Sequence, residues 1–319
     1  MPNRRDQLVL FGRDQLIETA QEDRQEVRRI GWASEILTHQ GEDVSYLHAG
    51  LCMAALPHRK PADDLEPWIR TNGRFKLAVW PGRILNKDGS HGQIGVPYGT
   101  RARLILLYLM TTAIRTQSRC VPMERSMSAW LRRIGLPVTG GPRGTIRPVR
   151  EQALRISRCE FTLRLDEEGR ADLHDRRLVE GLHLWAADAN SEWPESVELT
   201  HEFFDHLREH AVPLDERAIA KIKGSALALD LYVWLVYRLP RLARPVRLSW
   251  HQLKEQFGSQ IRSTSSFAQN VREALLDVLA AYPDGRVEIL KGGVELQPAR
   301  PAIPTRRGGL LVIPGRGSR

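Results

Sequence analysis

The sequence has few cysteines, and their spacing excludes two common ways of stabilising a small domain. The three cysteines, Cys52, Cys120 and Cys159, are odd in number, and no two of them form a CxxC pair. A disulfide framework needs an even set and a structural zinc site needs clustered ligands, so we expect neither. Unpaired thiols are typical of a reducing compartment, and the sequence therefore predicts a cytoplasmic protein.

The sequence also lacks a long apolar run. The longest, near residues 104–110, is far shorter than the roughly 20 residues that a membrane helix needs. The N-terminal stretch MPNRRDQLVLFGRDQ is interrupted early by arginines and acidic residues, which is not the pattern of a secretory signal. We therefore expect no association with a membrane. The length of 319 residues is enough for two or three modest domains.

Motifs of common enzymatic sites are missing as well. The glycine-rich stretch GGPRG at 140–144 lacks the Gly-Lys-Ser/Thr end of a P-loop. His201 and His206 are five positions apart, so on a helix they diverge instead of facing one metal ion. No paired histidines lie near a tyrosine, as a DNA-nicking site would require. We therefore expect no catalytic residues, no cofactor and no metal.

Lysine is absent from the most strongly charged part of the chain. Residues 101–160 hold 12 arginines and three glutamates, and their net charge of +9 equals the formal charge of the whole chain. Residues 161–224 carry 8 basic and 15 acidic side chains. Such a charge distribution attracts a polyanion to one face, and guanidinium groups bind phosphates and guanine edges through two hydrogen bonds. The composition therefore favours binding of nucleic acid over the alternative, a basic helix that only faces solvent.

An order of elements in residues 102–165 recurs in residues 227–290. Each stretch opens with an apolar helix, continues with a short strand, and then has a second helix that begins after a serine, Ser126 or Ser249. A third helix, with the text Val-Arg-Glu in both copies, and a β-hairpin complete the unit. This is the order of a winged helix, whose last helix enters the major groove of DNA. We therefore predict an α+β, mainly helical fold with two winged-helix units (helix-turn-helix plus β-hairpin) in tandem, after an N-terminal helical and extended region.

The expected boundaries follow this order. They are an N-terminal helical segment at 1–55, a first winged-helix unit with an extended lead-in at 56–175, an acidic helical linker at 176–225, a second winged-helix unit at 226–300, and a basic flexible tail at 301–319.

The candidate DNA-binding residues lie in and before the third helix of each unit. Arginines dominate in the first unit, beside glycines that permit a close approach of backbone to phosphate. In the second unit hydroxyl groups suit phosphates, and amide side chains suit adenine edges. The candidates are Arg143, Thr145, Arg147, Arg150 and Arg155 in the first unit, and Arg262, Ser263, Thr264, Ser265, Ser266, Gln269, Asn270 and Arg272 in the second.

Several stretches of the sequence resemble the plasmid-encoded RepA family of replication initiators. They include LPHRK at 56–60, VPYGTRARLILLYLMTTAIRT at 96–116, VREQALRISRCEFTL at 149–163 and SWHQLKEQFG at 249–258. The resemblance runs from about residue 50 to about residue 304. It departs from the family pattern at 142–143, where Pro-Arg stands in place of a frequent lysine.

The resemblance implies a non-enzymatic protein that binds repeated double-stranded DNA sites at a plasmid origin and recruits host replication proteins. It also implies that a homodimer forms in an autorepressing state, while monomers bind the origin. A winged-helix transcriptional repressor and an origin-nicking enzyme are the alternatives.

Overall fold

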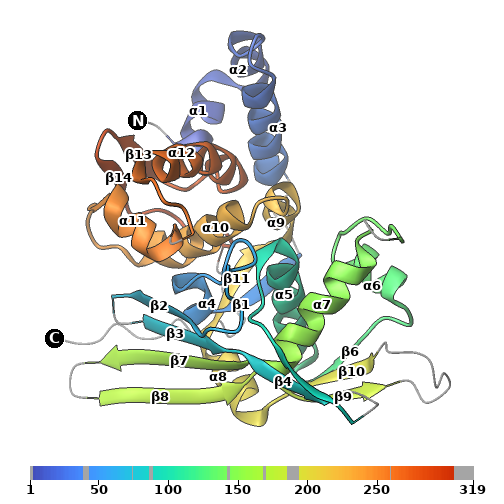
Figure 1. Cartoon of the computed structure of the whole chain (residues 1–319). Helices are drawn as coiled ribbons and strands as arrows, with labels where there is room; N and C mark the ends of the chain where they lie inside the picture. Colours follow the sequence, from blue (N-terminus) through green and yellow to red (C-terminus); the bar gives the residue numbers. More distant parts are fainter. Residues whose placement is uncertain are drawn as a thin grey trace. The chain divides into compact units, whose positions relative to one another are not determined.

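The computed structural model describes residues 3–38, 43–73, 75–85, 89–141, 144–167, 170–184, 194–258 and 260–304. It is a mixed α+β structure in which helices predominate over small antiparallel sheets, as the sequence predicts (Figure 1). Its contacts divide the chain into two compact units. We call residues 46–211 the inserted unit, and residues 1–45 together with 212–319 the split unit.

The inserted unit contains five helices and two larger sheets within its described residues. Its elements in chain order are α4 (Ala49–Met53), β2 (Trp68–Asn72), β3 (Phe75–Trp80), β4 (Gly82–Leu85), β5 (His91–Ile94), α5 (Gly99–Thr116), β6 (Cys120–Pro122), α6 (Met127–Arg133), α7 (Ile146–Arg158), β7 (Glu160–Glu167), β8 (Arg170–Arg177), β9 (Val179–Leu184), β10 (Pro194–Leu199) and α8 (His201–His210).

The strands of the inserted unit are distributed over separate antiparallel sheets. One sheet has the order β2-β3-β7-β8 and another the order β6-β10-β9. The hairpin β7–β8 that follows α7 therefore joins β3, with Leu77 opposite Leu163, while β6 pairs with β10, with Val121 opposite Val197. The order helix, strand, helix, helix, hairpin is the predicted one, but the strand before α6 and the hairpin after α7 belong to different sheets.

The apolar side of α7 faces the core of this unit. Val149 is fully buried and Ile156 is 1% exposed, while α5, apolar on nearly every side, lies against α7. Trp130 and Leu131 of α6 are fully buried as well. This packing leaves the charged side of α7 at the surface.

The split unit joins the two ends of the chain. Its elements are α1 (Arg4–Phe11), α2 (Arg13–Thr19), α3 (Arg24–Thr38), α9 (Glu216–Ile222), α10 (Ala226–Arg238), a 3₁₀ turn (Leu239–Arg241), β12 (Val246–Ser249), α11 (Trp250–Phe257), α12 (Thr264–Ala281), β13 (Val287–Leu290) and β14 (Gly293–Leu296). The boundaries between the units fall in β1 (Val44–His48) and β11 (Ala211–Asp215). The strands β12, β14 and β13 form one antiparallel sheet, in which β14 is central.

The helix α3 packs on α12 and so makes the N-terminus part of the split unit. Ile30 and Ala33 are almost fully buried, and Nε of Arg29 lies 2.8 Å from a carboxylate oxygen of Asp277. The expected separate segment at 1–55 is therefore not a unit of its own, because its apolar residues need α12 to cover them.

The acidic stretch 176–225, expected to be a helical linker, instead contains strands as well as helices. It includes β9, β10, α8, β11 and α9 and contributes to both units. The interpretation as a helix relied on net charge and missed an alternation in β10, where Val197 and Leu199 are buried between more exposed neighbours. Residues 305–319, most of the expected tail, lie outside the described part of the chain.

The serine caps of the repeat and one of its two helix-ending glycines are confirmed, whereas Gly258 is the C-cap of α11 with a φ of −115°. Ser126 accepts a hydrogen bond from the backbone of Ala129 at the start of α6. Ser249 and Gln252 form a reciprocal capping box at the start of α11. The residue after α6 is Ile134, and Gly135 follows with a φ of 71°, as a helix-ending glycine should.

Within the described residues, none of the helices has both the length and the apolar character required to cross a bilayer.

Candidate nucleic-acid interface

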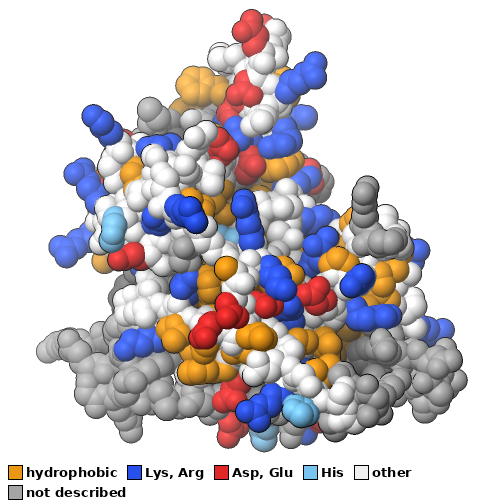
Figure 2. Space-filling view, viewed as in Figure 1, with side chains coloured by type: hydrophobic (Ala, Val, Ile, Leu, Met, Phe, Trp, Pro, Cys, Tyr) orange, Lys and Arg blue, Asp and Glu red, His pale blue; other side chains and the backbone are white. Residues whose placement is uncertain are grey.

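The first candidate surface is the outward side of α7. Arg147, Arg150 and Arg158 are all exposed, and their spacing of three and eight residues places them on one side of the helix. We call these three residues the arginine face. Arg132 and Arg133, at the end of α6, are also exposed. Figure 2 shows basic side chains over α6 and α7. This surface therefore has a positive charge that attracts phosphates.

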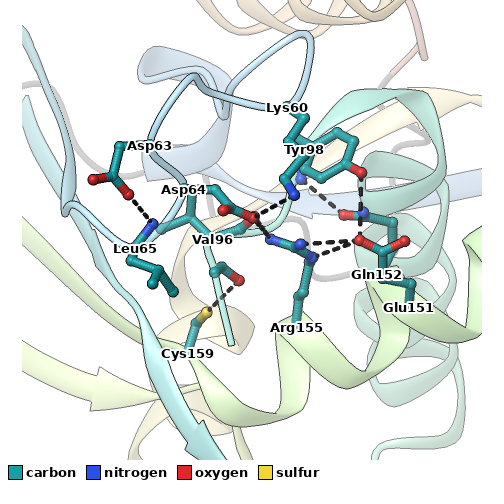
Figure 3. A network of polar contacts seen from close by, with 11 residues as sticks. Lys60, Asp63, Asp64, Leu65, Val96, Tyr98, Glu151, Gln152, Arg155 and Cys159 are labelled. Atoms are coloured by element: carbon teal, nitrogen blue, oxygen red, sulfur yellow. Dashed lines mark hydrogen bonds and ion pairs between the residues drawn. The ribbon is translucent and has the colours of Figure 1, made fainter. Parts of the chain in front are cut away.

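Arg155, from the same helix, has a different environment. It is only 6% exposed and reaches into the unit, where Nη1 donates to the Asp64 carboxylate at 2.5 Å and to the Val96 carbonyl at 3.0 Å (Figure 3). Its Nε donates to Glu151 at 3.0 Å. Burial lowers the pKa of Arg155, but the hydrogen bond and charge of Asp64, with those of Glu151, outweigh it and raise the pKa. Each of its three nitrogens thus already has a partner within the protein, and we assign Arg155 to holding α7 in place instead of to contacting DNA.

Tyr98, the residue before α5, connects the same network to that helix. Its backbone N–H donates to Gln152 at 2.8 Å, and its hydroxyl donates to Glu151 at 3.4 Å. Burial and the nearby Glu151 raise the pKa of the Tyr98 hydroxyl, so it stays protonated and remains a donor. Tyr98 thus contacts two neighbouring side chains of α7, Gln152 and Glu151, and Glu151 also accepts from Arg155 within the helix. Together these contacts fix the rotation of α7.

The loop between α4 and β2, which we call the lead-in loop, supplies the acidic end of this network. Asp64 is held by its backbone, whose carbonyl accepts from Val96 at 2.9 Å, and it lies 3.6 Å from Nζ of Lys60. Gly95 leaves room for the ion pair, because a Cβ at that position would overlap both Asp64 and Arg155. We call the contacts among Asp64, Arg155, Glu151 and Tyr98 the α7 anchor.

A closed turn precedes α7. The Thr145 hydroxyl donates to the Pro137 carbonyl at 2.6 Å, and the Thr145 backbone donates to Thr139. A Cβ on Gly144 would overlap the carbonyl of Thr139, so glycine is needed where the turn closes. Thr145, a candidate DNA-binding residue, therefore uses its hydroxyl to stabilise the turn, and it makes no side-chain cap of α7. Arg143 lies outside the described residues.

The second candidate surface is the first half of α12, in the split unit. The helix turns its apolar side inward, with Phe267, Val271, Leu275 and Val278 all buried as the sequence predicts. Its polar residues point outward. Those that the structure leaves exposed are Arg262, Ser263, Thr264, Ser265, Ser266, Gln269 and Asn270.

Several of these side chains already have partners in the protein. Ser263 caps α12 by accepting from the backbone of Ser266, and its hydroxyl is 2.6 Å from that of Ser265. Gln269 donates to Glu273 at 3.2 Å. Arg272 is half-buried and stacks on Trp250, with Cζ 4.6 Å from the ring centroid. Among the candidates, Asn270 and Thr264 have no partner that the structure records.

The hairpin β13–β14 is fixed to the start of α11. The Trp250 indole donates to the carbonyl of Lys291 at 3.0 Å, and its backbone donates to Gly292 at 3.1 Å. Lys291 and Gly292 form the tip of the hairpin, since Leu290 and Gly293 are the last paired residues. Arg272 on α12 touches the same indole, so one tryptophan joins the hairpin tip, α11 and α12.

The histidines considered as metal ligands do not converge. Nδ1 of His201 lies 3.1 Å from Asp205, whereas His206 turns to His48, with 2.8 Å between Nδ1 of His206 and Nε2 of His48. The described part of the chain holds no group of three residues arranged to bind a metal ion.

Sequence reasoning missed the residues of the lead-in loop. Asp64 is 91 positions from Arg155, and no local pattern joins them. The nearest signal was the turn-rich stretch LPHRKPADD at 56–64, whose first five residues also belong to the resemblance, and it indicates a turn but no partner for Asp64.

Comparisons with known proteins bear on the first of these surfaces. Residues 96–252 match the family model described as plasmid encoded RepA protein, so the resemblance stated from the sequence is confirmed over that segment. A crystal structure of domains 2 and 3 of RctB, as the selenomethionine derivative, has a TM-score of 0.50 at 14% identity and covers 77% of this chain and 95% of that chain. A second crystal structure of these two domains has a TM-score of 0.47 at 15% identity, covering 77% and 94%. At such identity the first of these supports the fold alone, and no curated protein matches the chain.

Proposed function

We propose that this chain, whose residues 96–252 belong to the plasmid-encoded RepA family, initiates plasmid replication by binding repeated double-stranded DNA sites at the origin. It acts as a binding protein and not as an enzyme, and it recruits host replication proteins to the bound origin. The observation that carries the proposal is the arginine face of a helix that the family model covers and the α7 anchor holds in place.

For the split unit we propose a winged helix of the usual kind, and its element order and strand pairing support this. The elements α10, β12, α11, α12 and the hairpin β13–β14 follow one another in the winged-helix order, and β12 pairs with the hairpin in one sheet. In this reading α12 is the recognition helix and the hairpin tip at 291–292 is the wing. Its exposed Gln269 and Asn270 read base edges.

In the inserted unit, α6 and α7 form the helix-turn-helix. The arginine face binds phosphates, and the glycines at 140, 141 and 144 bring backbone close to the DNA. The first winged-helix unit is therefore proposed with its hairpin β7–β8 paired to β3, in a different sheet from β6. In the split unit, by contrast, the hairpin and β12 share one sheet.

The charge balance of the two units supports a division of labour between them. Residues 101–160 carry a net charge of +9, whereas residues 226–290 carry only +2. The inserted unit supplies most of the sequence-independent attraction, and the split unit supplies most of the sequence discrimination. A second copy of the chain pairs with the first in a repressing form, as the family resemblance implies.

Footprinting on the DNA that flanks its own gene tests the proposal. An initiator protects several directly repeated sites, spaced by whole turns of the double helix. One protected palindrome would instead identify a transcriptional repressor.

A nicking assay separates the proposal from the enzymatic alternative. Supercoiled origin plasmid is incubated with the protein and Mg²⁺, and an initiator of this kind leaves both strands intact. Conversion to open circles that depends on the protein would contradict the assignment as a binding protein.

A further inference from the structure

The last turn of α1 carries an exposed apolar segment. Val9 is 77% exposed, Leu10 67% and Phe11 50%, and Val9 and Leu10 are the two most exposed large hydrophobic side chains in the described part of the chain. We call residues 9–11 the apolar tip. The surface over α1 and α2 shows hydrophobic side chains in Figure 2. Single exposed apolar residues are common, but three consecutive ones need an explanation.

The base of α1 is fixed, so the apolar tip is not simply a frayed end. Asn3 caps the helix by accepting from the backbone of Asp6. Arg5 lies 2.6 Å from Asp284, and its backbone donates to Pro283 at 3.1 Å. These contacts hold the first turn against the C-terminal part of the split unit.

The C-terminal end of α1 leaves the apolar tip accessible. The helix has no buried residue, and neither has α2. Gly12 follows Phe11 with a φ of 74°, a conformation that suits glycine and directs the chain away from the helix axis. The apolar side chains therefore project from a short helix whose continuation turns aside.

A second copy of the chain is a poor occupant for this segment. Stable protein pairs bury at least about 1,200 Å² in total, and large aromatic side chains bury about 150–250 Å² each. Two tips of three side chains fall well short of that area. A lipid surface fits poorly as well, because the basic residues at the base of α1 are occupied: Arg4 lies 2.7 Å from Glu26, and Arg5 pairs with Asp284.

A preformed pocket on a larger protein suits the segment better. A few apolar anchors that enter a dry pocket can carry most of the affinity of an interface. We infer that the apolar tip inserts into a preformed apolar pocket of a host replication protein. The inference rests on the proposed function, which it deepens by naming the contact through which the host protein is recruited.

The test compares two variants of the full chain. Leu10→Ala with Phe11→Ala removes the tip, and Leu65→Ala with Ile69→Ala is the control, because Leu65 and Ile69 are 44% and 55% exposed in the inserted unit. Each chain is immobilised and exposed in turn to the purified replicative helicase, its loader, the primase and the sliding clamp of the host. We expect one of these proteins to bind the wild-type and control chains equally and the tip variant at least 10-fold more weakly.

Binding of origin DNA is measured on the same chains. The tip variant should bind origin DNA as the wild type does and fail to replicate an origin plasmid in host extract. If the wild type binds no origin DNA, the proposed function fails, while binding of the host protein without DNA still decides this inference.

Three results would overturn the inference. One is that no protein of the panel binds in a manner that depends on Leu10 and Phe11. The second is that the tip variant sediments with a lower mass than the wild type, which would identify a second copy as the occupant. The third is that anionic phospholipid vesicles co-sediment with the wild type but not with the tip variant.

Discussion

The position of an arginine in the sequence does not determine what it does in this chain. Arg150 and Arg155 are five residues apart in one helix and belong to one basic run. Arg150 is exposed, whereas Arg155 is buried between Asp64 and Glu151. A buried guanidinium is retained only with partners, because an unpaired charge in the interior is costly. The same residue type therefore serves two purposes on two sides of α7.

This difference predicts opposite effects of two similar substitutions. Arg155→Ala should lower the free energy of unfolding by about 3–5 kcal/mol, because it leaves the Asp64 carboxylate without its guanidinium partner. Arg150→Ala should change it by less than about 0.5 kcal/mol, as surface substitutions usually do. Urea denaturation of both variants measures the difference.

A double-mutant cycle supplies the control for this prediction. Asp64→Asn combined with Arg155→Ala should cost clearly less than the sum of the single changes, since the two side chains contact one another. Strict additivity would show that the α7 anchor is not an energetic unit.

At the scale of elements, different interactions fix the orientation of the two helices α7 and α12. The rotation of α7 is fixed by an ion-pair network that reaches the lead-in loop. That of α12 is fixed by apolar packing, with Phe267 fully buried and α3 against its later turns. In both cases one side is fixed and the opposite side is exposed.

The arginine face predicts a specific dependence of DNA binding on salt. Each phosphate that is neutralised contributes about −0.9 to the slope of log K against log salt. Arg147→Ala with Arg150→Ala should therefore weaken binding to all DNA sequences alike and make the slope less steep by about 1.8. Fluorescence anisotropy over a salt series measures this.

Arg208→Ala is the matched control, because Arg208 is an exposed arginine on α8 in the acidic part of the chain. It should leave the slope unchanged. An unaltered slope in the Arg147 and Arg150 double variant would place the arginine face away from DNA.

The exposed amides of α12 predict an effect on discrimination and not on general affinity. Gln269→Ala or Asn270→Ala should reduce the preference for the cognate repeat over base-substituted repeats by about 1–3 kcal/mol per lost bidentate contact. Competition binding against a set of altered repeats measures this preference.

Leu276→Ala, on the same helix and 39% exposed, serves as the control and should keep the preference intact. If only the arginine-face variants alter base preference, the two units have the reverse roles.

Local features were predictable from the sequence, and long-range partnerships were not. The capping box of Ser249 and Gln252 spans three residues, and the buried stripe from Phe267 to Val278 follows from helical spacing. In contrast, the pairing of Arg155 with Asp64 spans 91 positions, and that of Arg29 with Asp277 spans 248. A pattern of spacing describes one element at a time, so it shows which side of α7 is polar but not which arginine finds a carboxylate.

At the scale of the whole molecule, the two units differ in how the chain forms them. The inserted unit is one continuous stretch, whereas the split unit needs both ends of the chain. Ile30, Ala33 and Ile36 of α3 are buried in the split unit, and each buried large aliphatic side chain contributes about 1.5–3 kcal/mol.

This arrangement predicts the outcome of truncation. Deleting residues 1–45 should leave α12 readily cleaved by protease and lower the urea midpoint of the split unit, while the inserted unit stays resistant. Limited proteolysis with mass spectrometry identifies the cleaved elements. Adding a peptide of residues 1–45 should restore protection, and equal resistance with and without these residues would contradict the prediction.

The split unit also has a consequence for the order in which the newly made protein matures. After Ser45 has left the ribosome, the whole inserted unit must be translated before Val212 emerges. At about 5–20 residues per second, this delay is on the order of 10–30 seconds. Because α12 begins only at Thr264, Ile30 and Ala33 of α3 stay uncovered beyond this delay, whereas the inserted unit is complete when Val212 emerges. The nascent chain therefore acquires its arginine face first, and the exposed amides of α12 take up their final positions only after that helix has emerged and packed on α3.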